Sequence, residues 1–356
     1  MSRYGLILAG GRGTRFWPQS RKKKSKQVLN IAGERTMIQA TVDRLKPRLP
    51  PDQIWVLTNG LLRDEIIRQL PEVPKAQILA EPEQRNTAAA IGLAAHILHS
   101  LDPEAVMGVF PADHVIDKPK RYLKMVTAAF AAAEQGSIAV LGIAPRWPET
   151  GYGYVEFPKH TVPGSLEPSA VKSFREKPDL KTAKHYVKKG NFYWNAGMFF
   201  WRADTVLANL REHLPKTATL LSSLPAFRDR GFAKKLQAVF PLCENISVDY
   251  AILERAKNVV GLACDEIGWN DVGSWNAVYD LLPRDADKNV TRSALAALSS
   301  TGNYVDAGKK LVALIDVNDL IVVDTPDALL VANRHKAQQV ADLVKLLEKR
   351  GSDELL

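Results

Sequence analysis

Three glycines and two cations follow the first apolar segment of the chain. The apolar run Leu6–Ala9 leads into a glycine-rich stretch with basic residues beyond it. The residues concerned are Gly10, Gly11, Gly13, Arg15 and Lys26. Backbone N–H groups of such a loop can approach phosphate oxygens closely, and arginine and lysine neutralise phosphate charge. The pattern predicts a polyphosphate site, although a tight turn that merely needs glycines is the alternative.

Two familiar phosphate-binding motifs do not fit this stretch. Phe16 stands where a dinucleotide-binding fingerprint needs its third glycine. No Gly-Lys-Ser/Thr closes the stretch, as a P-loop would require. The glycine stretch is therefore a phosphate-binding candidate of another kind.

The segments that would position this loop alternate between strand-like and helix-like patterns. Continuous apolar runs, typical of buried strands, occur at residues 6–9, 54–58, 77–79, 106–110 and 138–143. Apolar residues recur at helical spacing between them. This alternation predicts an α/β, Rossmann-like fold, with a mixed, mostly parallel sheet flanked by helices. Ligands of such sheets bind beyond the carboxyl ends of the strands, and Asp113 follows one such end.

The pattern becomes less regular from about residue 150 and changes again after Pro283. Strands are expected at residues 151–156, 171–175 and 197–201, and helices at 181–188 and 249–257. Short strands at 311–315, 320–323 and 328–331, divided by turns, precede a last amphipathic helix. We expect a catalytic domain at residues 1–285 and a small, β-rich C-terminal domain at 286–356. That domain should be a β-roll or β-helix-like unit that ends in a helix and contributes packing or assembly rather than catalytic groups.

The composition excludes several classes of protein. The chain has 356 residues and a formal net charge of +9. Its two cysteines, Cys243 and Cys264, lie in no Cys/His cluster, which argues against a disulfide framework or a structural zinc site. No run approaches the ~18 apolar residues of a membrane span, and the apolar run near the N-terminus does not resemble a signal peptide. We expect a cytoplasmic protein with no membrane partner.

The positive charge invites a nucleic-acid interpretation. The basic run Arg21–Lys24 is the main cluster, and a solvated loop is the better interpretation of it. No RNA-binding signature, zinc finger or aromatic-basic stripe accompanies it. We therefore expect no nucleic-acid partner.

A series of motifs runs down the chain in order. It begins with LAGGRGTRFWP at residues 8–18 and Lys26-Gln27, and continues with Glu81-Pro82, Asn86-Thr87-Ala88 and Pro111-Ala112-Asp113-His114. Later motifs lie at residues 149–154, 174–178, 194–199, 247–251 and 269–275. The set resembles the sugar-1-phosphate nucleotidylyltransferases, and the mannose-1-phosphate guanylyltransferase family in particular, over about residues 4–280. One departure is Ser25, because the family usually has proline before the Lys-Gln pair.

The resemblance implies a reaction in which GTP and mannose 1-phosphate give GDP-mannose and pyrophosphate, with Mg²⁺ as cofactor. A sugar phosphate has a second pKa near ~6, so it is largely a dianion at neutral pH and needs no general base. The reaction then needs charge neutralisation and in-line alignment at the α-phosphorus.

The resemblance also implies roles for individual residues. Those expected at the phosphates and the metal are Gly10, Gly11 and Gly13 around the nucleotide, Arg15 and Lys26 on the leaving phosphates, and Asp113 and Asp271 on Mg²⁺. Those expected around the base are Glu81, Asn86, Thr87 and Ala88. Those expected on the sugar phosphate are Gly153, Glu176, Lys177 and Asn195. His114 is a tempting base, but a structural role is the better interpretation.

Three alternatives stay open. The protein could be a nucleotidylyltransferase for a different base or sugar. It could be an inactive regulatory relative, which should then have lost a metal carboxylate or a phosphate cation, although Asp113, Asp271, Arg15 and Lys26 all remain. It could bind nucleic acid without turnover. The terminal helix could pack on the chain's own core or pair with a second copy, so a homodimer is a further expectation.

Overall fold

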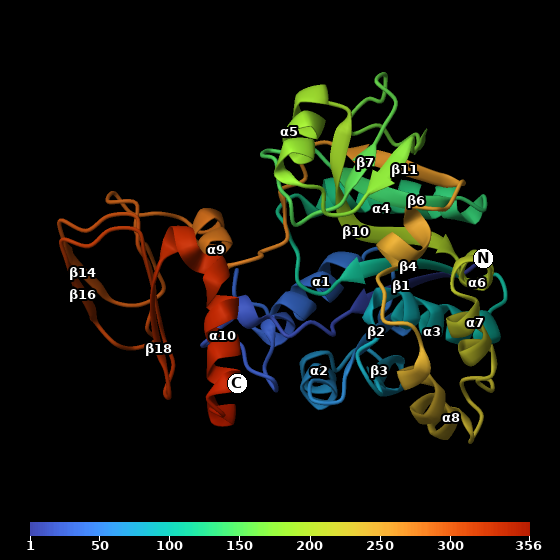
Figure 1. Cartoon of the computed structure of the whole chain (residues 1–356), viewed down its shortest axis with the longest axis horizontal. Coiled ribbons are helices and arrows are strands. Elements are labelled where there is room, and N and C mark those ends of the chain that lie inside the picture. Colours follow the sequence, from blue (N-terminus) through green and yellow to red (C-terminus); the bar gives the residue numbers. More distant parts are fainter.

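A ten-stranded mixed sheet forms the centre of the larger domain in the computed structural model, which describes all residues 1–356 (Figure 1). Its main strands run in the order β3-β2-β1-β4-β10-β6-β11-β8. They are β1 (Arg3–Leu8), β2 (Ile54–Asn59), β3 (Ile78–Glu81), β4 (Val106–Pro111), β6 (Ile138–Ile143), β8 (Ser169–Ala170), β10 (Phe192–Arg202) and β11 (Val259–Cys264). The first four are parallel, and β10 lies antiparallel between β4 and β6. The predicted mixed, mostly parallel α/β sheet is confirmed.

Strand β1 lies where the order of the strands reverses. The chain runs outward from β1 to β2 and β3, then returns to β4 on the other side of β1. Leu8, at the end of β1, is in register with Leu57 of β2 and Pro111 of β4. Such a reversal leaves a crevice outside the carboxyl ends of the strands, where ligands of open α/β sheets bind. The glycine loop, residues 10–13, and Asp113 both line this crevice.

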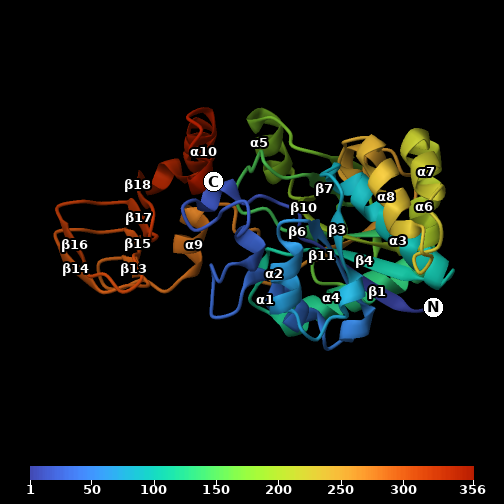
Figure 2. The ribbon, with the colours of Figure 1, turned by 90° about the horizontal axis from the view of Figure 1, so that it is seen from below.

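Helices cover both faces of the sheet (Figure 2). On one face lie α3 (Asn86–Leu101), α6 (Ala203–His213), α7 (Pro215–Ser222) and α8 (Phe232–Val239). On the other lie α1 (Met37–Leu45), α2 (Arg63–Gln69) and α4 (Pro119–Glu134). Helix α1 begins at a capping box, in which the Thr36 and Gln39 side chains each accept from the other's backbone N–H. None of the helices combines the length and apolar character that a membrane crossing requires.

A two-stranded ribbon joins the crevice to a distant part of the sequence. Strand β5 (Val115–Ile116) lies just after Asp113, and β12 (Trp269–Asn270) precedes Asp271 directly. The two pair antiparallel, with Trp269 opposite Ile116 and Asn270 opposite Val115. This short ladder is what carries Asp271 to the end of β4.

A smaller lobe lies beside β10. It contains β7 (Tyr154–Glu156), β9 (Ser173–Arg175) and α5 (Leu180–Lys189), and β7 pairs with both β10 and β9. The helix expected at residues 249–257 is wrong in its second half, since only Asp249–Leu253 is helical. The chain must turn there into β11, and Asn258 fixes this turn by donating to the Gly136 carbonyl.

Short stacked strands form the C-terminal domain (Figure 1). They are β13 (Val290–Thr291), β14 (Leu295–Leu298), β15 (Tyr304–Asp306), β16 (Val312–Ile315), β17 (Leu320–Asp324) and β18 (Leu329–Asn333). Strands β13, β15 and β17 stack in parallel, and so do β14 and β16, which is the arrangement of a β-helix. Asn303 ties successive turns together, because its amide donates to Asn289 and accepts from the Leu320 N–H. The predicted β-helix-like domain is confirmed.

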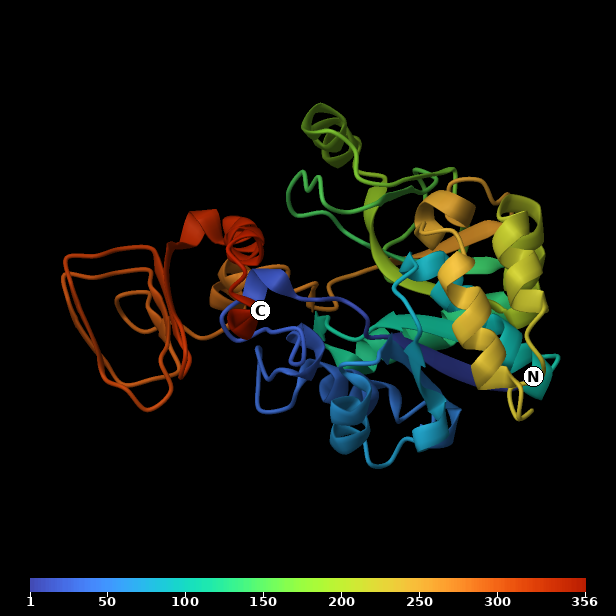
Figure 3. The ribbon, with the colours of Figure 1, turned by 60° about the horizontal axis from the view of Figure 1, so that its bottom comes forward.

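The C-terminal domain packs against the segment that follows the glycine loop. Helix α9 (Trp275–Leu281) precedes the boundary expected near residue 285, and α10 (Val340–Lys349) ends the domain. Phe16 and Trp17 share one hydrophobic core with Val344 of α10. The Trp17 indole N–H donates to the Leu355 carbonyl at 2.9 Å. Figure 3 accordingly shows the C-terminus beside the blue segment that follows the glycine loop, and far from the N-terminus itself.

Candidate active site

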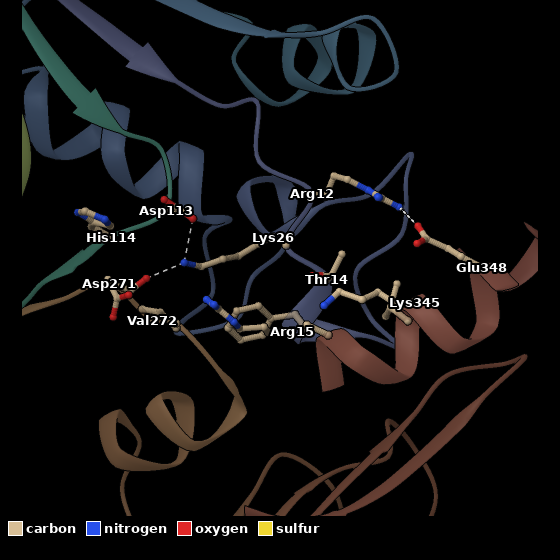
Figure 4. Close-up of a pocket in the computed structure, with 15 residues that line it drawn as sticks. Arg12, Thr14, Arg15, Lys26, Asp113, His114, Asp271, Val272, Lys345 and Glu348 are labelled. Carbon is tan, nitrogen blue, oxygen red and sulfur yellow. Dashed lines mark hydrogen bonds and ion pairs between the residues drawn. The ribbon is translucent and has the colours of Figure 1, made fainter. Parts of the chain in front are cut away.

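Lys26 lies in the crevice between Asp113 and Asp271, the two predicted metal ligands (Figure 4). Its Nζ is 2.9 Å from Asp113 Oδ2 and donates to the backbone carbonyl of Asp271 at 2.6 Å. The Lys26 side chain is only 7% exposed. Arg15 lines the same cavity, which has a volume of about 620 Å³, and makes no ion pair of its own. The four residues predicted to be catalytic therefore lie around one cavity.

Gly13 allows the glycine loop to lie against Lys26. Its φ is +60°, a conformation that L-residues with a side chain rarely adopt. A Cβ atom at this position would lie 2.7 Å from Lys26 Cβ and 2.9 Å from Lys26 N. Both the backbone conformation and the close approach therefore require glycine here.

Ser25 takes part in a relay that holds the glycine loop. Its hydroxyl donates to Gln27 Oε1, and Gln27 Nε2 donates to the Gly11 carbonyl at 3.0 Å. Ser25 and Gln27 are both buried. The φ of Ser25 is −79°, which proline could also adopt. The departure from the usual proline thus leaves the backbone course intact and adds a side-chain hydrogen bond.

The surroundings of Asp113 favour its ionised form. Burial is the largest single influence and would raise the pKa of Asp113, but the positive charge of Lys26 and the hydrogen bonds to the carboxylate together hold the pKa below its ordinary value. Burial lowers the pKa of His114 to about 4, so this imidazole is neutral at physiological pH. The Trp269 indole N–H donates to His114 Nδ1 at 3.2 Å, which fixes the tautomer that carries its proton on Nε2. His114 is therefore built into the wall, as its favoured structural role requires.

Tyr152 is a member of the site that sequence reasoning did not single out. Its hydroxyl donates to Asp271 Oδ1 at 2.6 Å, and burial raises the pKa of Tyr152 further above its ordinary value. The signal was present, because Tyr152 lies in the motif at residues 149–154, next to Gly153. Tyr152 leaves the second carboxylate oxygen of Asp271 free for other partners.

The donor atoms in the crevice suit a hard divalent cation. Asp113 uses one carboxylate oxygen on Lys26, and Asp271 uses one on Tyr152, so each keeps an oxygen without a side-chain partner. Mg²⁺ is usually held by one or two carboxylates together with phosphate oxygens and water. No group of three or more His, Cys, Asp or Glu side chains is placed to form an all-protein metal site. The two aspartates therefore fit a cation that is shared with a phosphate ligand.

A second cavity continues from the glycine loop toward β3. Its volume is about 500 Å³, and Asp113 lines both this cavity and that of Lys26. The predicted nucleotide-binding residues that line it are Gly10, Gly11, Glu81, Asn86 and Thr87. Burial raises the pKa of Glu81, at the end of β3, to about 8. This cavity is large enough for a nucleoside, and the Glu81 carboxyl is part of its lining.

Three residues at the start of α3 differ in what they offer. Asn86 is exposed and adopts a φ of +60°, and its Oδ1 accepts from the Thr87 N–H. The Thr87 hydroxyl accepts from the Val248 N–H at 2.9 Å. Ala88 is buried in the core, and its N–H donates to the Ile246 carbonyl. Ala88 does not line the cavity, so the structure separates it from the other predicted base contacts.

The four predicted sugar-phosphate residues form their own cluster. The Asn195 N–H donates to the Gly153 carbonyl at 2.8 Å, and Lys177 Nζ is 2.6 Å from Glu176 Oε1. A Cβ atom on Gly153 would meet Glu176 Oε2, which is buried without a hydrogen-bond partner. Lys177 is half exposed, and its positive charge is available to an incoming phosphate.

Asp249 completes this cluster, although sequence reasoning gave it no role. Its Oδ1 accepts from Asn195 Nδ2 at 2.9 Å. Burial, together with the nearby charge of Glu176, raises the pKa of Asp249 to about 6. Its motif, at residues 247–251, belongs to the series that resembles the family, but no spacing rule connects this motif with β10. The cluster therefore offers a polar rim of carboxylates, an amide and a cation, which is suited to hydroxyl groups and a phosphate.

Comparison with known proteins places the chain in a family. A family model described as nucleotidyl transferase matches residues 4–288, and one for the MannoseP isomerase/GMP-like beta-helix domain matches residues 295–347. The mannose-1-phosphate guanylyltransferase of Escherichia coli is 35% identical over 356 residues, which cover 98% of this chain and 76% of that protein. The chain belongs to the mannose-1-phosphate guanylyltransferase family. As a member of this family it is a nucleotidyltransferase acting on a sugar 1-phosphate.

Further relatives agree with this family membership. The xanthan biosynthesis protein XanB of Xanthomonas campestris pv. campestris (strain B100) is 37% identical, over 98% of this chain and 74% of its own length. A crystal structure from Thermus thermophilus, described as a mannose-1-phosphate geranyltransferase, superposes with a TM-score of 0.85 at 32% identity. It covers 98% of this guanylyltransferase-family chain and 100% of its own. Both domains of the fold are thus shared.

Proposed function

We propose that the protein transfers GMP from GTP to mannose 1-phosphate, releasing pyrophosphate and forming GDP-mannose. The observation that carries the proposal is the placement of Lys26 between Asp113 and Asp271, at the reversal of strand order and beside the glycine loop. The names of the related proteins support the choice of guanine and mannose.

The acceptor phosphate supplies its own nucleophile in this mechanism. A sugar phosphate is largely dianionic at neutral pH, since its second pKa is near ~6. No side chain needs to remove a proton, and His114 Nδ1 is already occupied by the Trp269 N–H. Lys177 and the polar groups around Asn195 would hold the sugar phosphate for in-line attack on the α-phosphorus.

The leaving pyrophosphate is the group that most needs stabilisation. Lys26 uses two of its three N–H donors on the protein, which leaves one for a phosphate oxygen. Arg15 lines the same cavity without an ion-pair partner. Asp113 and Asp271 would hold Mg²⁺, which supplies further neutralisation of phosphate charge when it is bound. Preorganised charges of this kind act where negative charge grows during the displacement.

Glu81 provides a physical basis for the choice of guanine. Guanine presents two adjacent N–H donors on its Watson–Crick edge, and a carboxylate presents two acceptors. The Glu81 carboxyl lines the second cavity, the one beside β3, and makes no ion pair, so both of its oxygens are free to accept from a base. A base without matching donors would leave this buried carboxyl unpaired. A site of this type therefore discriminates strongly against such a base.

A pyrophosphate-release assay over four nucleoside triphosphates and several sugar 1-phosphates tests the proposal. We expect GTP with mannose 1-phosphate to be the best pair. Faster turnover of UTP or dTTP with glucose 1-phosphate would assign a different base and sugar. Binding of nucleotide without turnover of any pair would favour the inactive-relative alternative, and salt-dependent DNA binding without turnover would favour the nucleic-acid one.

The pH dependence of GTP binding tests the role of Glu81. The free enzyme must lose the Glu81 proton to accept both guanine donors, and burial raises the pKa of Glu81 to about 8. The KM for GTP should therefore fall as pH rises from 7 to 8.5, by roughly tenfold per unit at most. Glu81→Gln should have a high KM that no longer varies with pH over this range. The same pH profile in both proteins would show that another group titrates.

A further inference from the structure

Helix α10 forms one wall of the cavity that contains Lys26. The residues of α10 that line the cavity are Ala341, Val344, Lys345 and Glu348. The position of the helix is fixed, because Val344 is buried against the segment after the glycine loop and Trp17 donates to the Leu355 carbonyl. A helix from the C-terminal domain thus faces the carboxylates across the phosphate cavity (Figure 4).

Arg12 connects the glycine loop to this helix. It lies between Gly11 and Gly13, and its Nη2 donates to Glu348 Oε1 at 2.5 Å. The two side chains are 47% and 35% exposed, and an ion pair so open to solvent adds little to stability. Arg12 makes no other side-chain hydrogen bond or ion pair. Most of its five N–H donors are therefore available to a ligand in the cavity.

We propose that Arg12 binds the terminal phosphates of the nucleoside triphosphate, and hence the leaving pyrophosphate, and that Glu348 positions it from the C-terminal domain. This inference rests on the proposed function, since a triphosphate must occupy the crevice. Arg12 would be a binding residue, whereas Glu348 would act through Arg12. It would give the C-terminal domain a role beyond the packing or assembly that its sequence suggests.

The order of the cavities supports this assignment. If the base lies beside Glu81, the rest of the nucleotide runs past Gly10 and Gly11 toward Asp113, which lines both cavities. Phosphates that continue in this direction enter the Lys26 cavity, of which α10 forms one wall. The cations lining that cavity are Arg12, Arg15, Lys26 and Lys345. Four cations against three carboxylates leave an excess of positive charge at the place where the pyrophosphate would leave.

Glu348 contributes by fixing an otherwise mobile side chain. A free arginine loses rotamer freedom when it binds phosphate, and prior placement reduces that loss. Glu348 engages a single nitrogen, Nη2, so the planar guanidinium can still present other N–H groups in a fork to phosphate oxygens. The ion pair therefore prepares Arg12 rather than saturating it.

Pyrophosphate binding to the intact protein, measured by titration calorimetry, tests the inference. Arg12→Ala should weaken pyrophosphate binding about tenfold, because a charge-assisted hydrogen bond is lost. Glu348→Ala should weaken it about threefold, while Glu348→Gln, which keeps an acceptor for Arg12, should retain most of the affinity. The double variant with both alanines should equal Arg12→Ala alone, because Glu348 has no effect without Arg12.

The ion pair between Lys22 and Asp353 provides a matched control. It also joins the N-terminal segment to the C-terminal domain, at 2.9 Å, and neither residue lines the Lys26 cavity. Lys22→Ala should leave pyrophosphate affinity unchanged. An equal loss in this control, an unchanged affinity in Arg12→Ala, or tighter binding in Glu348→Ala would each overturn the inference. Every reaction of this type releases pyrophosphate, whatever the base or sugar. If GTP proved not to be the preferred nucleotide, the pyrophosphate-binding measurements would therefore still test the role of Arg12.

Discussion

Replacing either Asp113 or Asp271 with asparagine should lower kcat by at least two to three orders of magnitude while the fold survives. Asparagine keeps the shape of each side chain and removes one negative charge. Both aspartates line one cavity together with Lys26, which pairs with the Asp113 carboxylate and donates to the Asp271 backbone carbonyl, so each loss weakens the same charge arrangement around the phosphates. Loss of one preorganised electrostatic group typically costs roughly 10²–10³ in kcat. Steady-state kinetics with Mg²⁺ titration, together with thermal melting, measures both parts of this expectation.

The double variant distinguishes a shared site from two separate ones. If Asp113 and Asp271 hold one Mg²⁺ together, removing both should cost little more than removing one, because residues that act as a unit are not additive. Asp265→Asn is a suitable control, since Asp265 is a paired carboxylate that lies outside both cavities, 2.9 Å from Arg121. Near-normal, Mg²⁺-dependent turnover in a folded Asp271→Asn protein would place the metal elsewhere.

The pairing of these two carboxylates shows how far sequence patterns reach. Asp113 could be placed because it follows a continuous apolar run, and such runs are buried strands whose ends meet at one edge of a sheet. Asp271 could be placed only by resemblance to a family. The ribbon that carries it to Asp113 has two residues per strand, and so short a ladder has no periodicity to detect.

The antiparallel strand β10 illustrates a second limit. Its apolar residues predicted a strand, but β10 is inserted between β4 and β6 after a long intervening segment. Register and direction there depend on contacts between distant residues, such as Phe199 with Val109 on one side and Val140 on the other. Such pairings cannot be predicted from the residues of the strand alone.

The docking of α10 on the phosphate cavity was also beyond sequence reasoning. The amphipathic pattern predicted that the last helix buries one face, and the structure places that face on Phe16 and Trp17. Whether an apolar face packs within the chain or on a second copy depends on the shape of both surfaces. A homodimer remains a prediction, which size-exclusion chromatography with light scattering would test.

Lys26→Ala should lower kcat by about 10²–10³, whereas Lys23→Ala should leave it unchanged. Lys26 is almost fully buried and bonded to Asp113 and to the Asp271 carbonyl, while Lys23 is exposed and unpaired. Loss of one charge-assisted contact to the forming pyrophosphate should raise the barrier by about 3–4 kcal/mol. The two variants remove the same charge from the same basic segment, so net charge cannot explain a difference. Steady-state kinetics of both proteins, with melting temperatures, provides the measurement.

The division between kcat and KM shows when Lys26 acts. Negative charge on the leaving phosphates grows as the bond to the α-phosphorus breaks, so a cation placed there binds the transition state more tightly than GTP. Lys26→Ala should then lower kcat and kcat/KM together, with a smaller change in KM. A raised KM with an unchanged kcat would mean that Lys26 holds substrate and transition state equally. Equal effects from Lys23→Ala would place the phosphate cation elsewhere in the basic segment. The hydrogen bonds from Ser25 through Gln27 to Gly11 would then serve to position the glycine loop and not a catalytic Lys26.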